Sequence, residues 1–396
     1  MLRISTIWFL LVLSSPWIVM LGEEKYQVDG WLAIGLYEFD LADGLFRSLY
    51  YFVVTVPIII MLYLGRPKPQ KNRKFIFTTR FTIRMYHIAF MILFCLVAFY
   101  FNLGITGVET DTGGWRLSGI AHYIRSYIFL LIIAIYVFGK RPPSILIIFI
   151  YSTISGITAG SRFVAVAPLM LYLMRLFYGE EGVKRNIHLA LSMLMMFALF
   201  AAVTTSRLVL LDDHYSFENL FLLISELDMD DVEILYQGFN QLFLRLGLGR
   251  DVILSYEVGE RDICHYYYGL YFNASSCFNP PMDFYGLSLA TDKFYLGNPM
   301  LSSVFVVSNE FFVKMGAALL YGLEAFLICF VVNYCLRGIP IGAILVHPLY
   351  FLLVVFVLVG PIFFAVYLMY AIIFLSVSYI VVTRFYRALR AGLLTG

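Results

Sequence analysis

The chain has 396 residues, of which 61% are hydrophobic and only 14% charged, and its formal net charge is +2. Soluble globular proteins are about 45–50% apolar and about 25% charged, so this composition excludes a soluble globular fold. Repeated apolar runs of about 17–22 residues instead predict an all-α polytopic integral membrane protein. The strands of a membrane β-barrel would appear as alternating segments of about 10 residues. We expect the chain to lie in a lipid bilayer and to bind no nucleic acid.

Ten apolar segments are predicted to be membrane helices. The first follows a single arginine in a signal-like N-terminus, but it is long for a cleaved signal and is interpreted as a retained helix. In chain order, the predicted spans are 5–21, 48–64, 85–103, 126–139, 144–160, 162–178, 188–205, 313–335, 343–359 and 361–382. The chain thus divides into membrane helices over 1–205, one large loop over 206–312, and further helices with a basic tail over 313–396.

Lysine and arginine gather in alternate loops between these spans. The segment "GRPKPQKNRKFIFTTRFTIR", residues 65–84, alone holds seven of them. The remaining basic loops are 140–143, 179–187, 336–342 and the tail from 383. Because cytoplasmic loops carry the excess of Lys and Arg, both termini are predicted to be cytoplasmic and the loop 206–312 to lie on the outer side.

The apolar stretch from 144 to 178 contains one arginine, Arg162, in "TAGSR". As a single helix, its 35 or so residues would extend about 52 Å, which is too long for a hydrocarbon core of about 30 Å. Two helices of about 26 Å each also preserve the alternation of charge between loops. We therefore predict a tight helical hairpin whose apex, at 160–162, lies at or slightly below the outer interface.

Most of the cations predicted on the outer side are arginines. They are Arg47, Arg116, Arg125, Arg162, Arg207, Arg245, Arg250 and Arg261, against Lys25, Lys293 and Lys314. The planar guanidinium binds phosphate through two parallel hydrogen bonds, so a pyrophosphate site is one interpretation. For Arg162 the alternative is that the side chain simply reaches lipid headgroups. Arg207, in "TTSR", is predicted at the same depth as Arg162, which favours a site.

The large outer loop is predicted to contain amphipathic helices, one of which carries Arg245 and ends near Arg250. His265, in this loop, and Glu310, just before the eighth span, are the candidate general bases. Cys264 and Cys277 could pair as a disulfide or remain thiols, and the sequence leaves both open. No C-x-x-C or His/Cys ladder occurs, so we expect no metal site and no cofactor.

Two segments resemble bacterial oligosaccharide repeat-unit polymerases, the Wzy-type O-antigen and capsule polymerases. One is the hairpin "TAGSRFVAVAPLMLYLM", with G-S-R followed by an apolar helix. The other is "SSVFVVSNEFFVKMGAALLYGLEAFLICFVVNY", with a polar rim and a helix that contains two glycines. About ten spans and one large outer loop before the last helices also match the architecture of that family. The R-x10-G pattern of some members is not found cleanly at Arg162, Arg245 or Arg250.

The resemblance implies a glycosyltransferase of the bacterial inner membrane that faces the periplasm. It would transfer a glycan from undecaprenyl pyrophosphate to another lipid-linked repeat unit, with no metal and no nucleotide. Arg162, Arg207, Arg245 and Arg250 would bind the pyrophosphate, and Glu310 or His265 would deprotonate the acceptor. A chain-length regulator protein is a candidate partner. An O-antigen ligase and a lipid-linked oligosaccharide flippase or other transporter are the alternative functions.

Overall fold

A computed structural model describes residues 9–10, 12–14, 41–67, 85–105, 115–139, 144–179, 183–210, 304, 310–339, 342–358 and 362–395. Throughout this part of the chain the regular structure is helical, as predicted from the composition. The first predicted span is described only at its helical residues 9–10 and 12–14. The predicted loop helices, with Arg245, Arg250, His265, Cys264 and Cys277, lie outside the described residues.

The helices follow the predicted apolar segments in chain order. They are α2 (Leu41–Leu64), α3 (Met85–Tyr100), α4 (Trp115–Tyr123), a π-helical turn η2 (Ile124–Ile128), α5 (Phe129–Val137), α6 (Ile145–Ala159), α7 (Arg162–Gly179), α8 (Val183–Leu210), α14 (Phe311–Arg337), α15 (Gly342–Leu358) and α16 (Ile362–Thr395). Helices α4, η2 and α5 are continuous, and they form one apolar segment from Leu117 to Val137.

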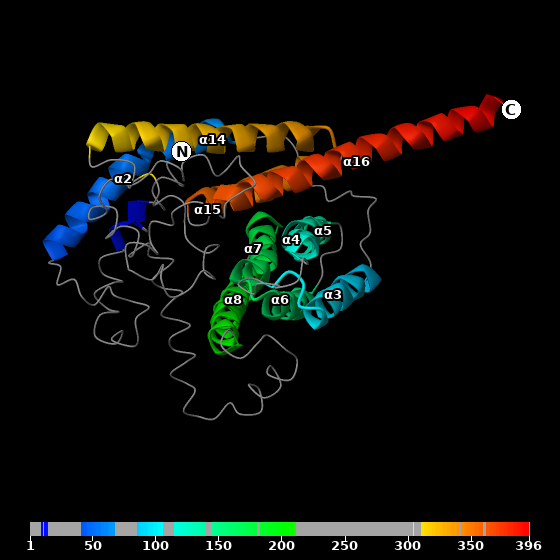
Figure 1. The fold of residues 1–396 in the computed structure, drawn as a ribbon, viewed down its shortest axis with the longest axis horizontal. Helices are drawn as coiled ribbons and strands as arrows, with labels where there is room; N and C mark the ends of the chain where they lie inside the picture. Colours follow the sequence, from blue (N-terminus) through cyan, green and yellow to red (C-terminus); the bar gives the residue numbers. More distant parts are fainter. Residues whose placement is uncertain are drawn as a thin grey trace.

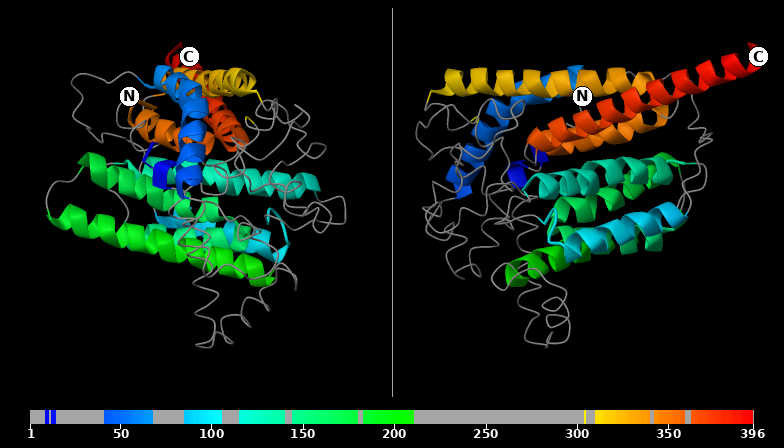
Figure 2. Two further views of the ribbon diagram at one scale, coloured as in Figure 1. Left: turned by 90° about the vertical axis from the view of Figure 1, so that its left-hand side faces the viewer. Right: turned by 45° about the vertical axis from the view of Figure 1, so that its right-hand side comes forward.

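The helices form two groups that pack side by side (Figures 1 and 2). One group contains α3 to α8, in which α7 packs against α5, α6 and α8, and α6 also contacts α3. The other contains α2, α14, α15 and α16, in which α14 contacts the other three. Helix α15 also touches α5 and α7, and α16 touches η2, so these contacts join the two groups.

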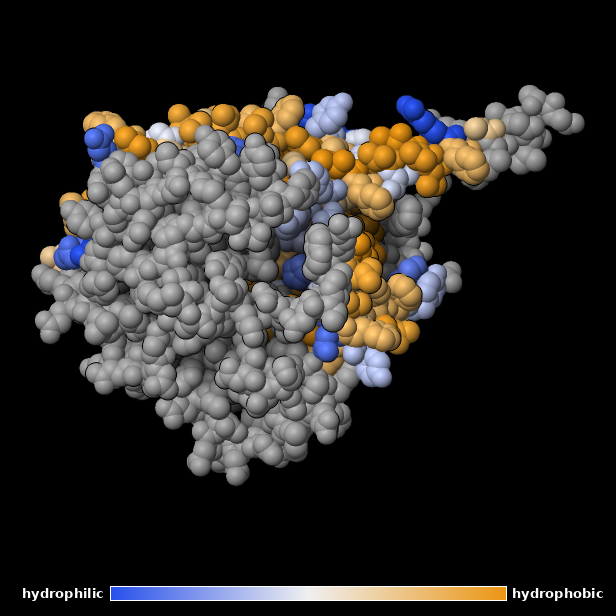
Figure 3. Space-filling model, in the orientation of Figure 1, coloured by the Kyte–Doolittle hydropathy of each residue, from blue (hydrophilic) through white to orange (hydrophobic). Residues whose placement is uncertain are grey.

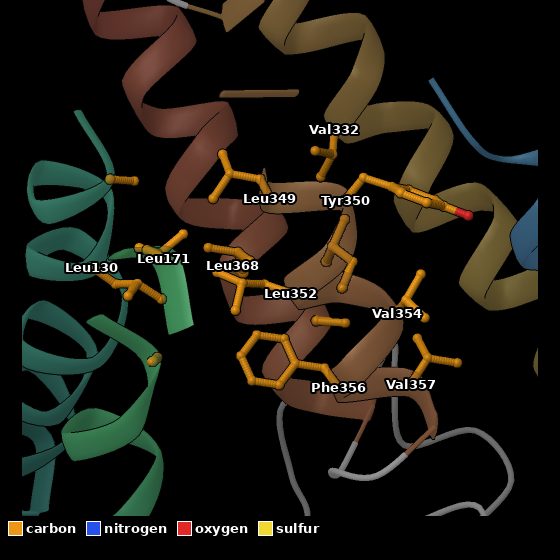
Figure 4. Close-up of a cluster of buried hydrophobic side chains, with 14 of the residues drawn as sticks. Leu130, Leu171, Val332, Leu349, Tyr350, Leu352, Val354, Phe356, Val357 and Leu368 are labelled. Atoms are coloured by element: carbon orange, nitrogen blue, oxygen red, sulfur yellow. The ribbon is translucent and has the colours of Figure 1, made fainter. Parts of the chain in front are cut away.

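The core between the two groups is built around α15. Figure 4 shows Leu352 and Phe356 of α15 among Leu130 of α5, Leu171 of α7 and Leu368 of α16. All of these side chains are buried. Interdigitated aliphatic and aromatic side chains of this kind hold helices by close packing, which is the dominant attraction between helices in a lipid environment.

The chain is a multi-pass membrane protein by the length and apolar character of its helices. Among the described residues, four helical segments are long and apolar enough to cross a bilayer: Ala42–Leu64, Leu117–Val137, Phe311–Arg337 and Ala365–Phe385. Shorter apolar helices are Met85–Tyr100, Ile145–Ala159, Asn186–Phe200 and Leu345–Leu358. Figure 3 shows apolar surface along α14 and α16. Large exposed apolar side chains there, such as Leu320, Leu327 and Phe374, suit contact with lipid.

Several helices are longer than the sequence predicted. Helix α2 begins at Leu41 rather than 48, and α8 continues to Leu210, so that Arg207 lies within it. Helix α16 runs to Thr395, well past the predicted end at 382. The segment predicted over 126–139 begins at Leu117, because polar residues in "WRLSGIAHY" lowered the local hydropathy. Arg125, which the sequence placed in the loop, is therefore inside a membrane-spanning segment.

Candidate functional site at the turn between α6 and α7

The predicted hairpin with its apex at 160–162 is confirmed. Helix α6 ends at Ala159, and Gly160 follows in the left-handed conformation, with φ 57° and ψ 25°. Its neighbour Ser161 donates its backbone N–H to the carbonyl of Gly156 at 3.1 Å, which closes the end of α6. Arg162 is then the first residue of α7. A glycine is required at 160 because other residues adopt this backbone conformation at a cost.

The hairpin can be this tight because Gly156 faces Ala165. A Cβ atom at position 156 would lie only 2.4 Å from the Cβ of Ala165. The same atom would lie 3.3 Å from Val203 of α8, so the three helices meet at this glycine. Small residues at such a crossing allow the backbones to approach closely, as they do in many membrane proteins.

The side chain of Arg162 turns into the protein. Its guanidinium carbon lies 5.2 Å from the ring centre of Phe200 on α8, and its Nε and Nη1 atoms are buried. Phe200 precedes Val203, which is level with Gly156, so the guanidinium lies below the turn and not above it. The adjacent Phe163 packs edge-on against Phe356 of α15, with ring centres 4.6 Å apart. This direction does not fit a side chain extended toward lipid headgroups.

The backbone of Arg207 can be placed relative to the α6–α7 turn, whereas its depth in the membrane stays a prediction. Because α7 reverses direction between them, α6 and α8 run the same way, and Val203 is level with Gly156. Four residues further along each helix, the backbone of Arg207 is therefore level with Gly160. Nothing further is described of the Arg207 side chain.

Arg125 is a second cation at the turn, and its importance was missed by the sequence analysis. It is 1% exposed and is the largest fully buried side chain in the described part of the protein. Its Nη1 donates to the carbonyls of Leu103 and Gly104, at 3.1 and 3.4 Å. Its Nη2 donates to the carbonyl of Cys95 and to the hydroxyl of Thr158, at 3.3 and 2.6 Å.

The segment around Arg125 is polar and irregular. Arg125 lies in η2, a π-helical turn, and such turns are rare and frequent at functional sites. The hydroxyl of Ser126 lies 3.4 Å from Nε2 of His122. The hydroxyl of Ser118 accepts the backbone N–H of Gly104 at 2.9 Å, which fixes the chain just after α3. The signal available in the sequence was the polar run "HYIRSY" at the edge of an apolar segment.

Glu310 is not placed beside Arg162. It precedes α14, is exposed, and its carbonyl accepts the first helical bond from Lys314 at 3.1 Å. Tyr321, further along α14, donates to the carbonyl of Val357 at the end of α15. Glu310 is eleven residues before Tyr321. Along the axis of α14 it therefore lies about 16 Å from the contact between Tyr321 and Val357. Its role as a general base stays a prediction, as does that of His265.

Positively charged groups lie at both helices of the α6–α7 turn. Arg125 is hydrogen-bonded to the last turn of α6, and Arg162 begins α7, whose N-terminus carries the partial positive charge of the helix dipole. Within the described residues, no three His, Cys, Asp or Glu side chains cluster as a metal site requires. The expectation that no metal is needed stays a prediction.

Comparisons with protein families, with curated proteins and with solved structures find no match to this chain.

Proposed function

We propose that this protein is a membrane glycosyltransferase that polymerises lipid-linked oligosaccharides. The donor would be an oligosaccharide on undecaprenyl pyrophosphate, and the acceptor a second lipid-linked repeat unit. The acceptor hydroxyl oxygen forms a bond to the anomeric carbon of the donor sugar and gives its proton to a base. The bond between that carbon and the pyrophosphate oxygen breaks, and lipid pyrophosphate leaves with the electron pair.

The observation that carries this proposal is the inward-turned Arg162 at the start of α7. A pyrophosphate leaving group gains negative charge as its bond breaks, so cations fixed at that point stabilise the transition state. Arg162 would contact the pyrophosphate directly, and Arg207, at the same depth, would be its companion. Phe163 and Phe200, both partly exposed, add aromatic surface near Arg162 that would suit a prenyl chain.

The charge pattern of the loops supports a site on the outer side. Basic loops such as 65–84 predict that both termini are cytoplasmic, and with ten spans the α6–α7 turn would then lie at the periplasmic face of a bacterial inner membrane. The chain beyond α8, which ends three residues after Arg207, is predicted to lie on this same side. It would supply Arg245, Arg250 and the candidate base His265 to the site.

The experiment that tests this function is a gel of cell-surface glycan from a strain that lacks the gene. A polymerase mutant should attach one repeat unit to each lipid core, and complementation should restore the ladder of long chains. A complete loss of surface glycan repeats would instead indicate a ligase. Accumulation of lipid-linked repeats at the cytoplasmic face would indicate a flippase. Normal ladders in the deletion strain would overturn the proposal.

A further inference from the structure

Arg125 is held in place by acceptors for both of its terminal nitrogens, while its buried Nε has no hydrogen-bond partner in the described part of the protein. All four N–H groups of its two terminal nitrogens are used, three on carbonyls around the end of α3 and one on Thr158. The Thr158 hydroxyl donates its own hydrogen to the carbonyl of Ile154 at 2.6 Å. Its lone pairs are therefore left to face Arg125, and the guanidinium is tied to the last turn of α6.

The charge of Arg125 is only partly compensated by these contacts. Its four acceptors are neutral carbonyl and hydroxyl groups, and none is a carboxylate. The end of α3 adds a partial negative charge of about half a unit, which leaves a net positive potential. Burial of a cation in a membrane-spanning segment is costly, so such residues usually have a function. A neutral donor could cap the same carbonyls, as Tyr321 does for Val357 of α15.

We propose that Arg125 is a positioning residue for the anion site at the α6–α7 turn. It fixes Thr158, four residues before Arg162, and so fixes the turn from which Arg162 projects. It also places a fixed positive charge against the last turn of α6, which strengthens the binding of a pyrophosphate group by Arg162. This role rests on the proposed function, because it assumes that the anion at the turn is the pyrophosphate of a lipid carrier.

Binding of undecaprenyl pyrophosphate to the purified full-length protein in lipid nanodiscs tests this role. The dissociation constant and the thermal unfolding midpoint are measured for each variant. Arg125→Met should weaken binding about tenfold through loss of the nearby charge. Its matched control is Arg175→Met, because Arg175 of α7 similarly donates to the carbonyls of Val137 and Gly139 at the other end of the hairpin. That control should lower the midpoint but leave the dissociation constant unchanged.

A second pair of variants separates the hydrogen bond from the charge. Thr158→Val keeps the shape of the side chain but removes the acceptor for Arg125, and should weaken binding about threefold. Thr158→Ser should restore it. Thr55→Val is the control, because Thr55 is also buried and donates to a helix carbonyl, that of Phe52, but lies on α2 in the other helix group. If Arg125→Met does not fold, Thr158→Val and Thr158→Ser still test the positioning role.

The outcomes distinguish the two proposals. Tight binding by the wild type with equal binding by the Arg125 and Thr158 variants would overturn the positioning role and leave the polymerase proposal intact. Equal weakening by Arg175→Met would likewise overturn it, because the effect would then be general destabilisation. No binding by the wild type would overturn both. Weakening by Arg125→Met and Thr158→Val alone, with rescue by Thr158→Ser, is the expected result.

Discussion

The two helix groups satisfy the ends of their helices with different chemistry. The last carbonyls of a helix have no partner within it, and in a membrane water cannot supply one. In the group of α3 to α8, arginines do so: Arg125 reaches the end of α3 and Arg175 the end of α5. In the other group the donors are neutral. Asn333 donates to Gly65 at 2.8 Å and Tyr350 to Leu62 at 2.6 Å, both at the end of α2.

The difference shows that capping these carbonyls does not in itself require charge. Tyr350 and Asn333 do the same work without the cost of burying a cation. The two arginines therefore need a further explanation. Arg175 is only half-buried, so water or headgroups can solvate it. Arg125 is fully enclosed, and its charge is best explained by what lies beside it, the turn that carries Arg162.

The largest effect is expected from Arg162, the residue at the turn that explains the buried charge of Arg125. Arg162→Ala should abolish polymer formation while single-repeat surface glycan and protein level remain normal. Arg162→Lys should also fail, because an ammonium cannot form the paired hydrogen bonds of a guanidinium to phosphate. Surface-glycan gels and immunoblots provide the measurement, and Arg384→Ala, at an exposed position on α16, is the control. Normal ladders from Arg162→Ala would remove it from the site.

The next largest effect concerns the packing that holds the turn. Gly156→Ala would bring two Cβ atoms to 2.4 Å, so α6 and α7 must separate. Neither atom belongs to a flexible side chain, and we expect a loss of stability of about 1–3 kcal/mol. Thermal unfolding in detergent measures it. Since the turn would move with the helices, chain-length ladders should shorten as well, whereas unchanged ladders would mean that the turn tolerates displacement.

A smaller effect is expected from a neutral cap in the other group. Tyr350→Phe removes the hydroxyl that bonds Leu62 and leaves a buried carbonyl without that donor. The free energy of unfolding should fall by about 1–2 kcal/mol. Glycan ladders should keep their length, because the neutral caps of this helix group are proposed to stabilise the fold and not to take part in binding. Shortened ladders at normal protein level would show that both groups contribute to activity.

The smallest effect is expected from Gly316→Ala in α14. A Cβ atom at this position would meet nothing within 4 Å. Alanine also loses less conformational entropy than glycine in a helix, so stability should rise by up to about 1 kcal/mol. The same chemical change at Gly156 is the matched comparison, and thermal midpoints should move in opposite directions. A fall at Gly316 would reveal a contact on that face of α14.

The α6–α7 hairpin was predictable from the sequence because it depends on residues that are close together in the chain. The limit on helix length, together with Gly160 and Ser161, was enough to predict the hairpin and place Arg162 at its apex. The role of Arg125 was not predictable. Its acceptors Cys95, Leu103 and Thr158 are 22 to 33 positions away in the chain, and hydropathy gives no information about such contacts. Likewise, the inward direction of Arg162 depends on Phe200, from a different helix.

The shortness of α6 has a consequence for the surrounding bilayer. Fifteen residues extend about 22 Å, several ångströms less than a typical hydrocarbon core, whereas the 27 residues of α14 extend about 40 Å. Lipid next to the hairpin must thin to match it, and this deformation is confined to one flank of the protein. Membrane thickness thus helps to set how far a lipid headgroup descends toward Arg162. A thicker bilayer would bury the turn more deeply and raise the work of bringing a charged carrier to it.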